Sequence, residues 1–569
     1  MKLSTLFTKT TKEDPKGEVS SNALLLTRAG CIYKEMAGVY TFLPLGLKVI
    51  NKIKDIVRKH MDTVASELSM TVLWPEENRQ TTGRLDTVDV LMKTQGANEF
   101  SQKKCTNEYV INYSHEEMAT PIAQNFIQSY KDLPVAMYQI GTKFRNEARA
   151  KSWLLRGREF IMKDGYSFHA SEEDFEKYYD QMKLIYKNIY IELWLGDDTR
   201  ETLASGGDFT EKYSHEFQTI CDAGEDLIFI DPSTNISYNQ EIAPSKAPSY
   251  SYSQEQKPLE DVYGEDVTSV TKLTKFLQLP IEQCVKTMLY KGDDNKLYAV
   301  ALRGNYDVNE IKLTKALKIK RVTLLSDEEI KAETGAERGY AGIVNLPSHI
   351  TLISDDTLAP MTNFESGSNK THYHTININR DRDLPKPAKF YDIKQVKEGD
   401  LHPQSWSIYR VEKACEVGNI FPLETKYTKA FNFTYTDENN QQQPIIMWCY
   451  GVGISRLMGV IVEKFHDEKG IIRPANLAPF THVIIGIGEE GEVLASELYI
   501  SMKQQGKEVV LDDRDLSPGT KFKDADLIGY PYQIVIGKKT LDQGNKCELI
   551  TRKTGKKELV EIASLVSQK

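Results

Sequence analysis

The sequence has few of the features that anchor a protein in a membrane or crosslink it covalently. Its 569 residues include seven cysteines, none in a Cys-x-x-Cys pair, which argues against a zinc ribbon or a disulfide framework. No apolar run reaches the ~18–20 residues that span a bilayer, and residues 1–9 become polar too early for a secretory signal. We therefore expect a cytoplasmic protein with no structural zinc and no membrane partner.

Positive charge is also in short supply. The chain has 72 Lys and Arg against 81 Asp and Glu, a formal net charge of −9, so overall charge does not indicate nucleic-acid binding. Because salt confines each charge to about 8–10 Å, local basic patches can still bind RNA. A hydrophobic content of 40% over this length suggests roughly three or four domains.

Five side chains form a set suited to a nucleotide. Arg145 and Arg156 can pair with phosphate oxygens, and the Glu147 carboxylate can accept from an exocyclic amine. Phe160 offers a flat face to a base, and Arg456, in a Gly-x-Gly-x-x-Arg segment, can close the other side by cation–π stacking. A lone Arg-x-Glu is usually a surface ion pair and a lone Gly-x-Gly a tight turn, so the indication comes from the combination.

Together these segments resemble motifs 2 and 3 of the class II aminoacyl-tRNA synthetases. Residues 37–46 resemble motif 1, whose long helix and strand build a dimer interface in that class, so a homodimer is expected. The resemblance narrows to the bacterial-type prolyl-tRNA synthetases and covers nearly the whole chain. The segments that carry it are residues 114–117, 158–169, 214–217, 416–421 and 448–456.

The resemblance implies an enzyme that ligates L-proline to its tRNA through a prolyl-adenylate, using ATP with Mg²⁺. The amino acid carboxylate is itself the nucleophile, so the site should position substrates and stabilise charge. The implied roles are the α-phosphate for Arg145, the adenine amine for Glu147, the outer phosphates for Arg156, an adenine sandwich for Phe160 and Arg456, and Mg²⁺ for Glu416.

A proline pocket must hold a secondary ammonium and a small apolar ring. By resemblance, Glu116 would supply charge, Ser114 a hydrogen bond, and Phe168 with His169 a wall, with Ser214 in a further matching segment. Considered alone, Tyr-Ser-Phe-His is more typical of a buried strand with a satisfied histidine. The family pattern favours the pocket.

Residues 250–385 are predicted to form an inserted domain. A linker rich in Pro, Ser and polar residues precedes them, and residues 297–302, 349–353 and 375–378 read as separate strands. The block resembles the editing domain of the family, which hydrolyses mischarged Ala-tRNA. Such a domain is useful because a proline pocket rejects alanine by only about 10–200-fold.

Four residues are the predicted editing site. By resemblance, Lys286 would hold the tRNA 3′ end, and Gly339, Gly342 and His372 would shape the alanine pocket. His372 and His374 alternate and could share a face, but no Cys or acidic partner stands at ligand spacing, so no metal is expected.

The last segment contains a motif with two interpretations. Residues 486–491 fit Gly-x-Gly-x-x-Gly, but Glu489 and Glu490 place negative charge where a pyrophosphate would sit, and too little chain follows for a second mononucleotide half. Residues 512–527 and 533–537 instead resemble the anticodon-binding domain of class IIa synthetases. Candidate tRNA contacts are Arg514, Lys521, Lys523, Lys538 and Lys539.

The predicted fold is α+β and multidomain. Residues 1–249 and 386–474 would form a class II antiparallel sheet flanked by helices, 250–385 the inserted α+β editing domain, and 475–569 a C-terminal α/β anticodon-binding domain. Two alternatives stay open: a class IIa synthetase for another small amino acid such as threonine, and a non-catalytic synthetase-like tRNA-binding protein. Amino-acid-dependent pyrophosphate exchange separates the three.

Overall fold

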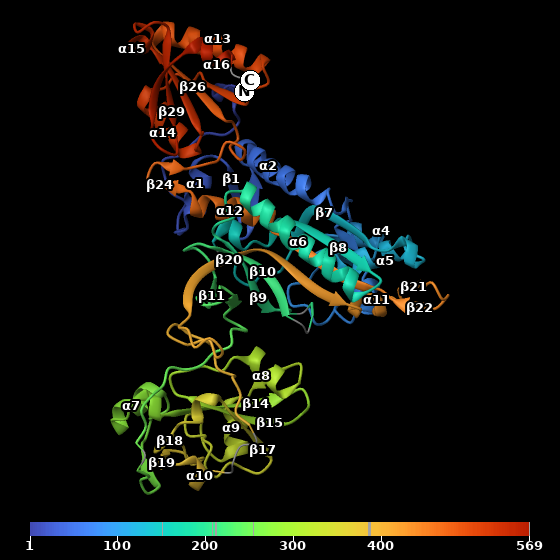
Figure 1. Cartoon of the computed structure of the whole chain (residues 1–569), viewed down its shortest axis with the longest axis vertical. Coiled ribbons are helices and arrows are strands. Elements are labelled where there is room, and N and C mark those ends of the chain that lie inside the picture. The colour runs from blue at the N-terminus through green and yellow to red at the C-terminus, as the bar shows by residue number, and fades with distance from the viewer. Residues whose placement is uncertain (151, 208, 211–212, 254, 385–388, 568–569) are drawn as a thin grey trace. The chain divides into compact units, whose positions relative to one another are not determined.

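A computed structural model describes residues 1–150, 152–207, 209–210, 213–253, 255–384 and 389–567. The chain divides into two compact units, drawn in Figure 1. The first comprises Met1–Glu201, Gly206–Glu225 and Lys413–Lys569, and the second Thr202–Ser205 and Asp226–Glu412. The predicted domain boundary between residues 385 and 386 lies outside the described residues.

A long sheet forms the centre of the first unit. Six strands of this nine-stranded sheet pair in the order β10-β20-β23-β8-β7-β3, with β3 parallel to β7 and the other pairs antiparallel. The strands are β3 (Ser66–Glu67), β7 (Val135–Phe144), β8 (Glu159–His169), β10 (Tyr213–Ile220), β20 (Arg410–Glu424) and β23 (Ile446–Val452). The predicted class II antiparallel sheet is confirmed.

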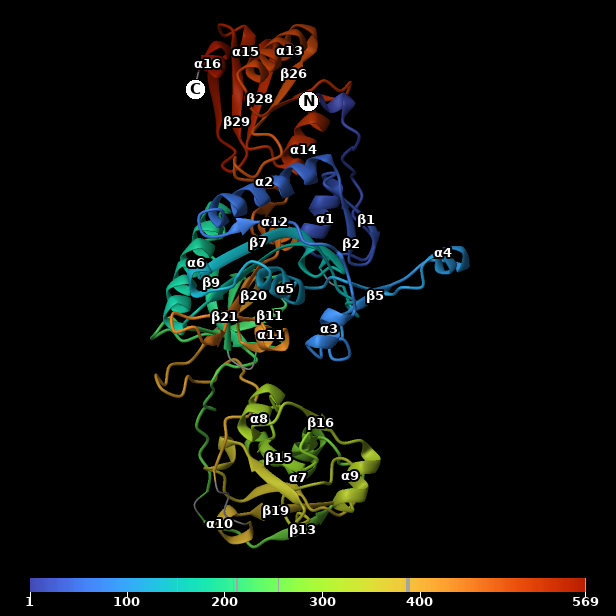
Figure 2. The same cartoon turned by 90° about the vertical axis from the view of Figure 1, so that its right-hand side faces the viewer.

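The two faces of this sheet differ because side chains alternate along a strand. On the back face, three helices bury apolar side chains against it: α2 (Pro44–Met61), α6 (Glu172–Glu192) and α12 (Ile454–Lys464). Figures 1 and 2 show α6 running along the sheet. Proline in the first turn and basic residues in the last turn favour α2 as a helix. The front face carries the polar side chains considered below.

Several short elements lie outside the sheet, and only some of them cover part of its front face. They are β4 (Leu73–Trp74), α3 (Glu77–Thr81), β5 (Met92–Thr94), α4 (Glu99–Lys104), β6 (Tyr109–Ile111), α5 (Glu116–Gln124) and α11 (Lys426–Ala430). Two acidic residues occupy the first turn of α5, where the partial positive charge of a helix N-terminus favours carboxylates. Figure 2 shows α4 well apart from the sheet. Nearer the N-terminus, the chain forms α1 (Ser21–Arg28) and then a hairpin of β1 (Ile32–Met36) and β2 (Val39–Phe42).

The second unit contains two smaller sheets. One has the order β16-β14-β15-β17 and the other β13-β19-β18. The strands are β13 (Glu260–Tyr263), β14 (Val285–Gly292), β15 (Leu297–Arg303), β16 (Val322–Leu324), β17 (Ile350–Ser354), β18 (Phe364–Gly367) and β19 (Tyr373–Ile378). The helices are α7 (Val270–Leu277), α8 (Glu310–Leu317), α9 (Asp327–Thr334) and α10 (Arg380–Asp383). The unit also contains β11 (Asp226–Ile230) and β12 (Ser237–Asn239), which pair with each other.

The end of the first unit is a separate α/β domain with sheet order β27-β26-β28-β29-β30. Its elements are β26 (His482–Ile487), α13 (Gly488–Gln504), β27 (Val509–Asp512), α14 (Pro518–Ile528), β28 (Tyr532–Gly537), α15 (Lys538–Leu541), β29 (Lys546–Thr551), β30 (Lys557–Glu561) and α16 (Ile562–Ser567). The first three strands are parallel and the last two antiparallel. A Cβ on Gly486 would lie 2.6 Å from the Glu492 Cα, so the glycine motif serves close packing of strand and helix.

The N-terminal segment belongs structurally to this domain. Lys2 forms a parallel bridge with Leu511. The Ser4 backbone N–H and hydroxyl donate to the Asp513 carboxylate at 2.9 and 2.7 Å. Among the residues described, no helix is both long and apolar enough to cross a membrane.

Candidate active site

The predicted nucleotide residues converge at one end of the front face. Arg145 follows β7, Phe160 lies at the start of β8, Glu416 is on β20, and Arg456 is in the first turn of α12. The Arg145 guanidinium carbon is 5.2 Å from the centre of the Phe160 ring. The Arg456 Nη1 is 3.7 Å from the Glu416 carboxylate. Residues separated by about 300 positions therefore share one site.

Arg145 is the most telling member of this group. Burial, followed by repulsion from Arg456, lowers its pKa, and its Nε atom has no hydrogen-bond partner within the described chain. Arg456 donates instead to the backbone oxygens of Leu155, at 2.7 Å, and Glu416, at 2.6 Å. Two carboxylates act on Arg145, but Glu147 is already paired with Arg156, so the two neighbouring guanidiniums make a site prepared for an anion.

Arg156 and Glu147 are paired with each other. The guanidinium donates twice to one Glu147 oxygen, at 2.8 and 3.0 Å, and lies 3.5 Å from Glu225. Burial opposes the charge, but these two carboxylates outweigh it and raise the pKa of Arg156. Because Arg156 is exposed, this surface pair can open at little cost when a charged ligand arrives.

The predicted proline residues share the front face, with one exception. The Ser114 hydroxyl donates to the Glu116 carboxylate, which is only 2% exposed at the N-terminus of α5. Phe168 is fully buried in the core on this face, beside Phe433 at 5.9 Å. Ser214 is buried on β10, and alternation along that strand places it on the same face as Glu216.

His169 is the exception and corrects the expected wall. It follows Phe168 directly on β8, so its side chain points to the back face, beneath α6. One ring nitrogen pairs with Asp174 at 2.9 Å and the other with the Ser167 hydroxyl at 2.8 Å. It is a satisfied, buried histidine, as the segment considered alone suggested.

The front face also contains an acidic centre that was not predicted from the sequence. Asp164, on β8, lies 2.5 Å from the Lys143 Nζ and 3.4 Å from His115, and accepts from Gln139 at 3.1 Å and Tyr166 at 2.9 Å. Burial opposes ionisation, but Lys143 and His115 hold the pKa of Asp164 well below its usual range. The sequence feature that could have indicated this centre is the Lys163-Asp164 pair, which interrupts an otherwise apolar, strand-like run.

A second missed cluster surrounds Glu117. Its carboxylate is fully buried and accepts from Arg79 at 2.7 Å, Arg84 at 3.1 Å and Thr82 at 3.2 Å. The Arg79 guanidinium also donates to the Ser114 carbonyl at 3.3 Å. The cluster therefore joins α3, the segment before α5, and α5 itself.

Glu416 is the one carboxylate predicted to bind Mg²⁺. Glu416 accepts from the Asn419 amide at 3.0 Å and retains oxygen lone pairs. No group of three or more His, Cys, Asp or Glu in the described parts of the chain could hold a metal. One carboxylate nevertheless fits an ion that arrives bound to nucleotide phosphates, because Mg²⁺ keeps several waters.

The predicted editing residues fall into two groups in the second unit. Lys286, on β14, donates to Asp307 at 2.6 Å and to the Tyr306 carbonyl at 2.8 Å, beside the start of α8. Gly342 lies on the other side of β14: a Cβ there would be 1.7 Å from the Gly367 oxygen. The structure does not bring Lys286 and this glycine segment onto one face.

Gly339 and His372 belong to the second group. Gly339 has φ +94°, which only glycine adopts readily. The His372 ring lies 5.4 Å from the Tyr340 ring, and His374 lies 5.3 Å from the same ring. His374, unlike His372, is buried, and it pairs with Glu365 at 2.9 Å.

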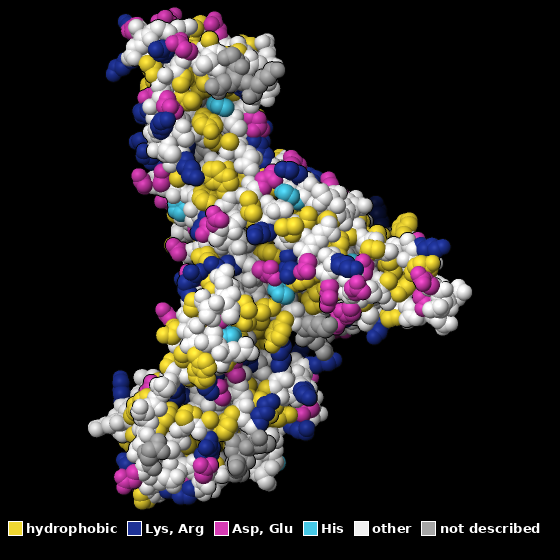
Figure 3. All heavy atoms as spheres, viewed as in Figure 1, with side chains coloured by type: hydrophobic (Ala, Val, Ile, Leu, Met, Phe, Trp, Pro, Cys, Tyr) yellow, Lys and Arg dark blue, Asp and Glu magenta, His cyan; other side chains and the backbone are white. Residues whose placement is uncertain are grey.

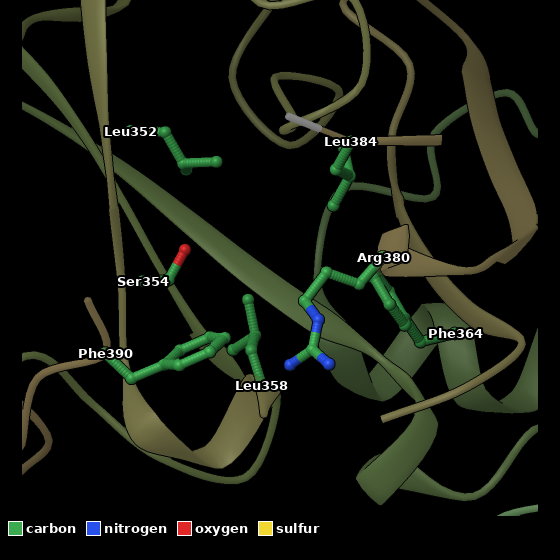
Figure 4. A pocket seen from close by; sticks show the side chains of 7 residues that line it. All are labelled: Leu352, Ser354, Leu358, Phe364, Arg380, Leu384 and Phe390. Carbon is green, nitrogen blue, oxygen red and sulfur yellow. The ribbon is translucent and has the colours of Figure 1, made fainter. Parts of the chain in front are cut away.

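A small cavity in the second unit is separate from all four residues. Its volume is about 10 Å³, enough for roughly one water. Figure 4 shows Arg380 and Phe390 among the side chains around it. The remaining lining residues are Leu352, Ser354, Leu358, Phe364 and Leu384.

The predicted tRNA contacts of the C-terminal domain differ in accessibility. Arg514 is held by Asp512 and Asp524, each at 2.8 Å, and Lys521 is only 3% exposed. Lys523, Lys538 and Lys539 are exposed. On the face visible in Figure 3, described Lys and Arg side chains are interspersed with Asp and Glu. A phosphate backbone would therefore meet local cations and no broad basic surface there.

Two family profiles match the chain. The profile described as the tRNA synthetase class II core domain (G, H, P, S and T) matches residues 99–465. The profile described as the anticodon binding domain matches residues 481–568.

Curated relatives match over the full length. The proline–tRNA ligase of Sulfurihydrogenibium sp. (strain YO3AOP1) is 41% identical over 576 residues, covering 100% of this chain and 99% of the relative. That of Bacillus cereus (strain B4264) is 37% identical over 571 residues, covering 99% and 98%.

Solved structures share the fold at low sequence identity. The prolyl-tRNA synthetase of Cryptosporidium parvum, complexed with halofuginone and AMPPNP, gives a TM-score of 0.57 at 12% identity, covering 98% of this chain and 77% of that one. The Giardia lamblia enzyme, in complex with prolyl-adenylate, gives 0.57 at 13% identity, covering 96% and 75%.

Proposed function

The chain belongs to the proline–tRNA ligases, a family of class II aminoacyl-tRNA synthetases, and from this premise we propose which residues carry each step. The enzyme uses ATP to join L-proline to its tRNA. The proline carboxylate attacks the α-phosphate of ATP, forming prolyl-adenylate and releasing pyrophosphate. A ribose hydroxyl of the tRNA then attacks the prolyl carbonyl, and AMP leaves.

Arg145 is assigned to the α-phosphate. Its partly unsatisfied guanidinium beside Arg456 supports this role, because charge builds on the phosphate oxygens as the carboxylate attacks. The substrate brings its own nucleophile, so these residues act by holding two anions together and not by moving a proton.

The remaining nucleotide roles are assigned around Arg145. Phe160 and Arg456 would enclose the adenine, Glu147 would accept from its amine, and Arg156 would take the outer phosphates once its pair with Glu147 opens. Mg²⁺ bound to ATP would neutralise and polarise the phosphates, with Glu416 as its protein ligand.

Glu116 is assigned to the secondary ammonium of proline. Ser114 orients its carboxylate, and Phe168 with Ser214 lies on the same face of the sheet. A buried carboxylate with one short hydrogen-bond partner can accept two N–H donors from the imino acid. His169 has no part in this pocket.

We assign residues 250–385 to an editing domain that hydrolyses Ala-tRNA, with Lys286, Gly339, Gly342 and His372 as its site residues. Residues 1–249 with 386–474 would form the catalytic domain. The second compact unit, with its own sheets and cores, supports an independent domain.

Residues 475–569 are assigned to anticodon binding, supported by the profile match over 481–568. Lys523, Lys538 and Lys539 are the accessible cations there. Arg514 and Lys521 would support the domain from within. We further propose a cytoplasmic homodimer formed through residues 37–46 and the adjoining hairpin.

The observation that carries these assignments is the convergence of Arg145, Glu416 and Arg456 beside Phe160, with Glu116 on the same face of the sheet. Pyrophosphate exchange measured separately with each amino acid tests them. Proline is expected to stimulate exchange by far the most. Greater stimulation by threonine would favour the first alternative, and no stimulation by any amino acid would favour a non-catalytic tRNA-binding protein.

A further inference from the structure

Two neighbouring glutamates on the first turn of α5 have very different surroundings. Glu116 and Glu117 are both buried, at 2% and 0% exposure. Successive helical residues point about 100° apart, so the two carboxylates face different environments. The Glu116 carboxylate accepts from Ser114, and none of the described arginines donates to it. Glu117 accepts from two arginines.

The two arginines are not equivalent. Arg79 is fixed between the Trp74 and Tyr113 rings, at 4.6 and 4.4 Å, and also donates to the Ser114 carbonyl. It therefore has several partners besides Glu117.

Arg84 is bound to Glu117 through one nitrogen, and its Nη2 atom is buried with no hydrogen-bond partner among the described residues. Its guanidinium donates to Glu117 and the Tyr427 hydroxyl, and the Phe209 ring lies 5.0 Å away. Burial opposes its charge, but the electrostatic effects of Tyr427, Tyr113, Glu117 and Glu116 outweigh it and raise the pKa of Arg84. Of the two cations, Arg84 is the one that can turn from one glutamate to the other.

We propose that Glu117 is a positioning residue for proline recognition: it holds the Arg84 guanidinium and so leaves the Glu116 carboxylate open to the substrate ammonium. Without the Glu117 charge, Arg84 would be a buried cation with a neutral phenol and aromatic rings around it. A buried cation without a paired charge is costly, and Glu116 is the other carboxylate that acts on Arg84, so the freed guanidinium would turn to it. An Arg84–Glu116 pair would occupy the acceptor that the imino acid needs. The inference rests on the proposed role of Glu116.

The first test is Glu117→Gln in proline-dependent pyrophosphate exchange. The KM for proline is expected to rise at least tenfold, while kcat and the KM for ATP stay within about twofold. Glu117→Asp keeps the charge and is expected to restore most of the proline affinity. If Glu117 only supported the fold, kcat and both KM values would worsen together, and that result would overturn the proposal.

The second test asks whether Arg84 carries the effect. Glu117→Gln combined with Arg84→Met removes the freed guanidinium, so the double variant is expected to bind proline better than Glu117→Gln alone. Arg84→Met alone leaves Glu117 paired with Arg79 and is expected to raise the KM for proline less than Glu117→Gln does. A double variant whose KM for proline equals or exceeds that of Glu117→Gln contradicts the proposal.

Two controls separate this inference from its premises. Arg552 is buried at 6% exposure and paired with Asp467, as Arg84 is with Glu117, but it lies in the C-terminal domain. Arg552→Met should lower thermal stability without changing the KM for proline. If Arg552→Met raised that KM as much as Glu117→Gln does, loss of any buried ion pair would be enough to weaken proline binding, and the proposal would be wrong. Glu116→Gln tests the premise: if it leaves the KM for proline unchanged, the pocket assignment fails whatever the Glu117 variants do.

Discussion

At the scale of single side chains, the arginines of the site differ in whether they are already paired with a carboxylate. Among the described residues Arg145 forms no ion pair with a carboxylate, whereas Arg156, Arg84 and Arg79 already bond to carboxylates. A cation that is partly buried and incompletely paired binds an anion without first losing another partner. This difference makes Arg145 the side chain on which adenylate formation should depend most.

Replacing Arg145 with alanine is therefore expected to lower kcat for pyrophosphate exchange by about 10²–10³-fold, as loss of a single charge-stabilising donor does in other enzymes. Proline-dependent exchange under saturating ATP provides the measurement. Arg58→Ala is the control, because Arg58 forms surface ion pairs with Asp55 and Glu67. Equal activity in the two variants would contradict the assignment.

Lys286 provides a prediction specific to editing. Lys286→Ala is expected to leave prolylation within about twofold and to slow Ala-tRNA deacylation at least tenfold, because the ammonium would no longer hold the tRNA 3′ end. Hydrolysis of preformed Ala-tRNA measures the loss. Lys291→Ala is a matched control on the same strand, five residues further along β14 and exposed. Unchanged deacylation by the Lys286 variant would remove it from the editing site.

Single residues also show where sequence reasoning ends. The nucleotide set was visible because its residue types stand in recognisable order. The cluster around Glu117 could not be predicted in this way, because Arg79, Arg84 and Tyr427 come from different segments and an isolated arginine is usually solvated. The error at His169 came from treating neighbours on a strand as one wall, although alternation sends them to opposite faces.

At the scale of elements, long periodic segments were the most predictable. Apolar residues recur at helical spacing from Leu47 to Met61 in the sequence, and α2 covers them. The run of residues 138–145 is typical of a strand, and β7 covers all of it but the last residue. The order of strands in the sheet was less predictable, because pairing joins segments that are distant in the chain. β20 lies between β10 and β23, for example, and the local sequence pattern of each strand does not indicate its neighbours. The face that holds the site depends on this order.

The C-terminal sheet contains an element with a predictable pH response. His482, at the start of β26, stacks on Tyr532 at 5.1 Å, and burial, followed by Lys507, lowers its pKa to about 4. The unfolded chain binds a proton near pH 6.5 that the folded domain takes up only near pH 4. Stability contributed by neutral His482 is thus complete above pH 6.5 and is lost as the pH falls toward 4.

Hydrogen exchange can detect this loss. Protection of the β26 and β28 amides, corrected for intrinsic exchange rates, is expected to fall between pH 7 and pH 5. His482→Phe retains a ring for Tyr532 but cannot titrate, so its protection should change less over the same interval. Identical pH dependence in the parent and the variant would show that His482 is not the titrating group.

At the scale of the whole molecule, the two compact units divide the proposed chemistry. The first contains the residues assigned to ATP, proline and the anticodon, and the second those assigned to editing. Composition alone suggested the insertion, because a polar linker and a new set of strands mark its start. The structure draws the division elsewhere, with the second unit running from Asp226 to Glu412 and including Thr202–Ser205.

The proposed homodimer makes a prediction at this scale. Tyr33 and Met36 on the β1–β2 hairpin are each 58% exposed, and a partner subunit docked on the hairpin would bury both. Replacing both with glutamate is expected to shift the protein toward monomer in sedimentation velocity. Leu184→Glu, at the same 58% exposure on α6, should leave the mass unchanged. Monomeric parent protein would refute the dimer itself.

The bridge between Lys2 and Leu511 has a consequence for biosynthesis. Translation at about 5–20 residues per second separates the emergence of these partners by on the order of a minute. During that interval the first residues have no strand to join, although the catalytic sheet has already left the ribosome. Docking of the leading segment should then be among the last events of maturation, and nascent chains arrested before residue 509 should lose it to protease while completed chains keep it.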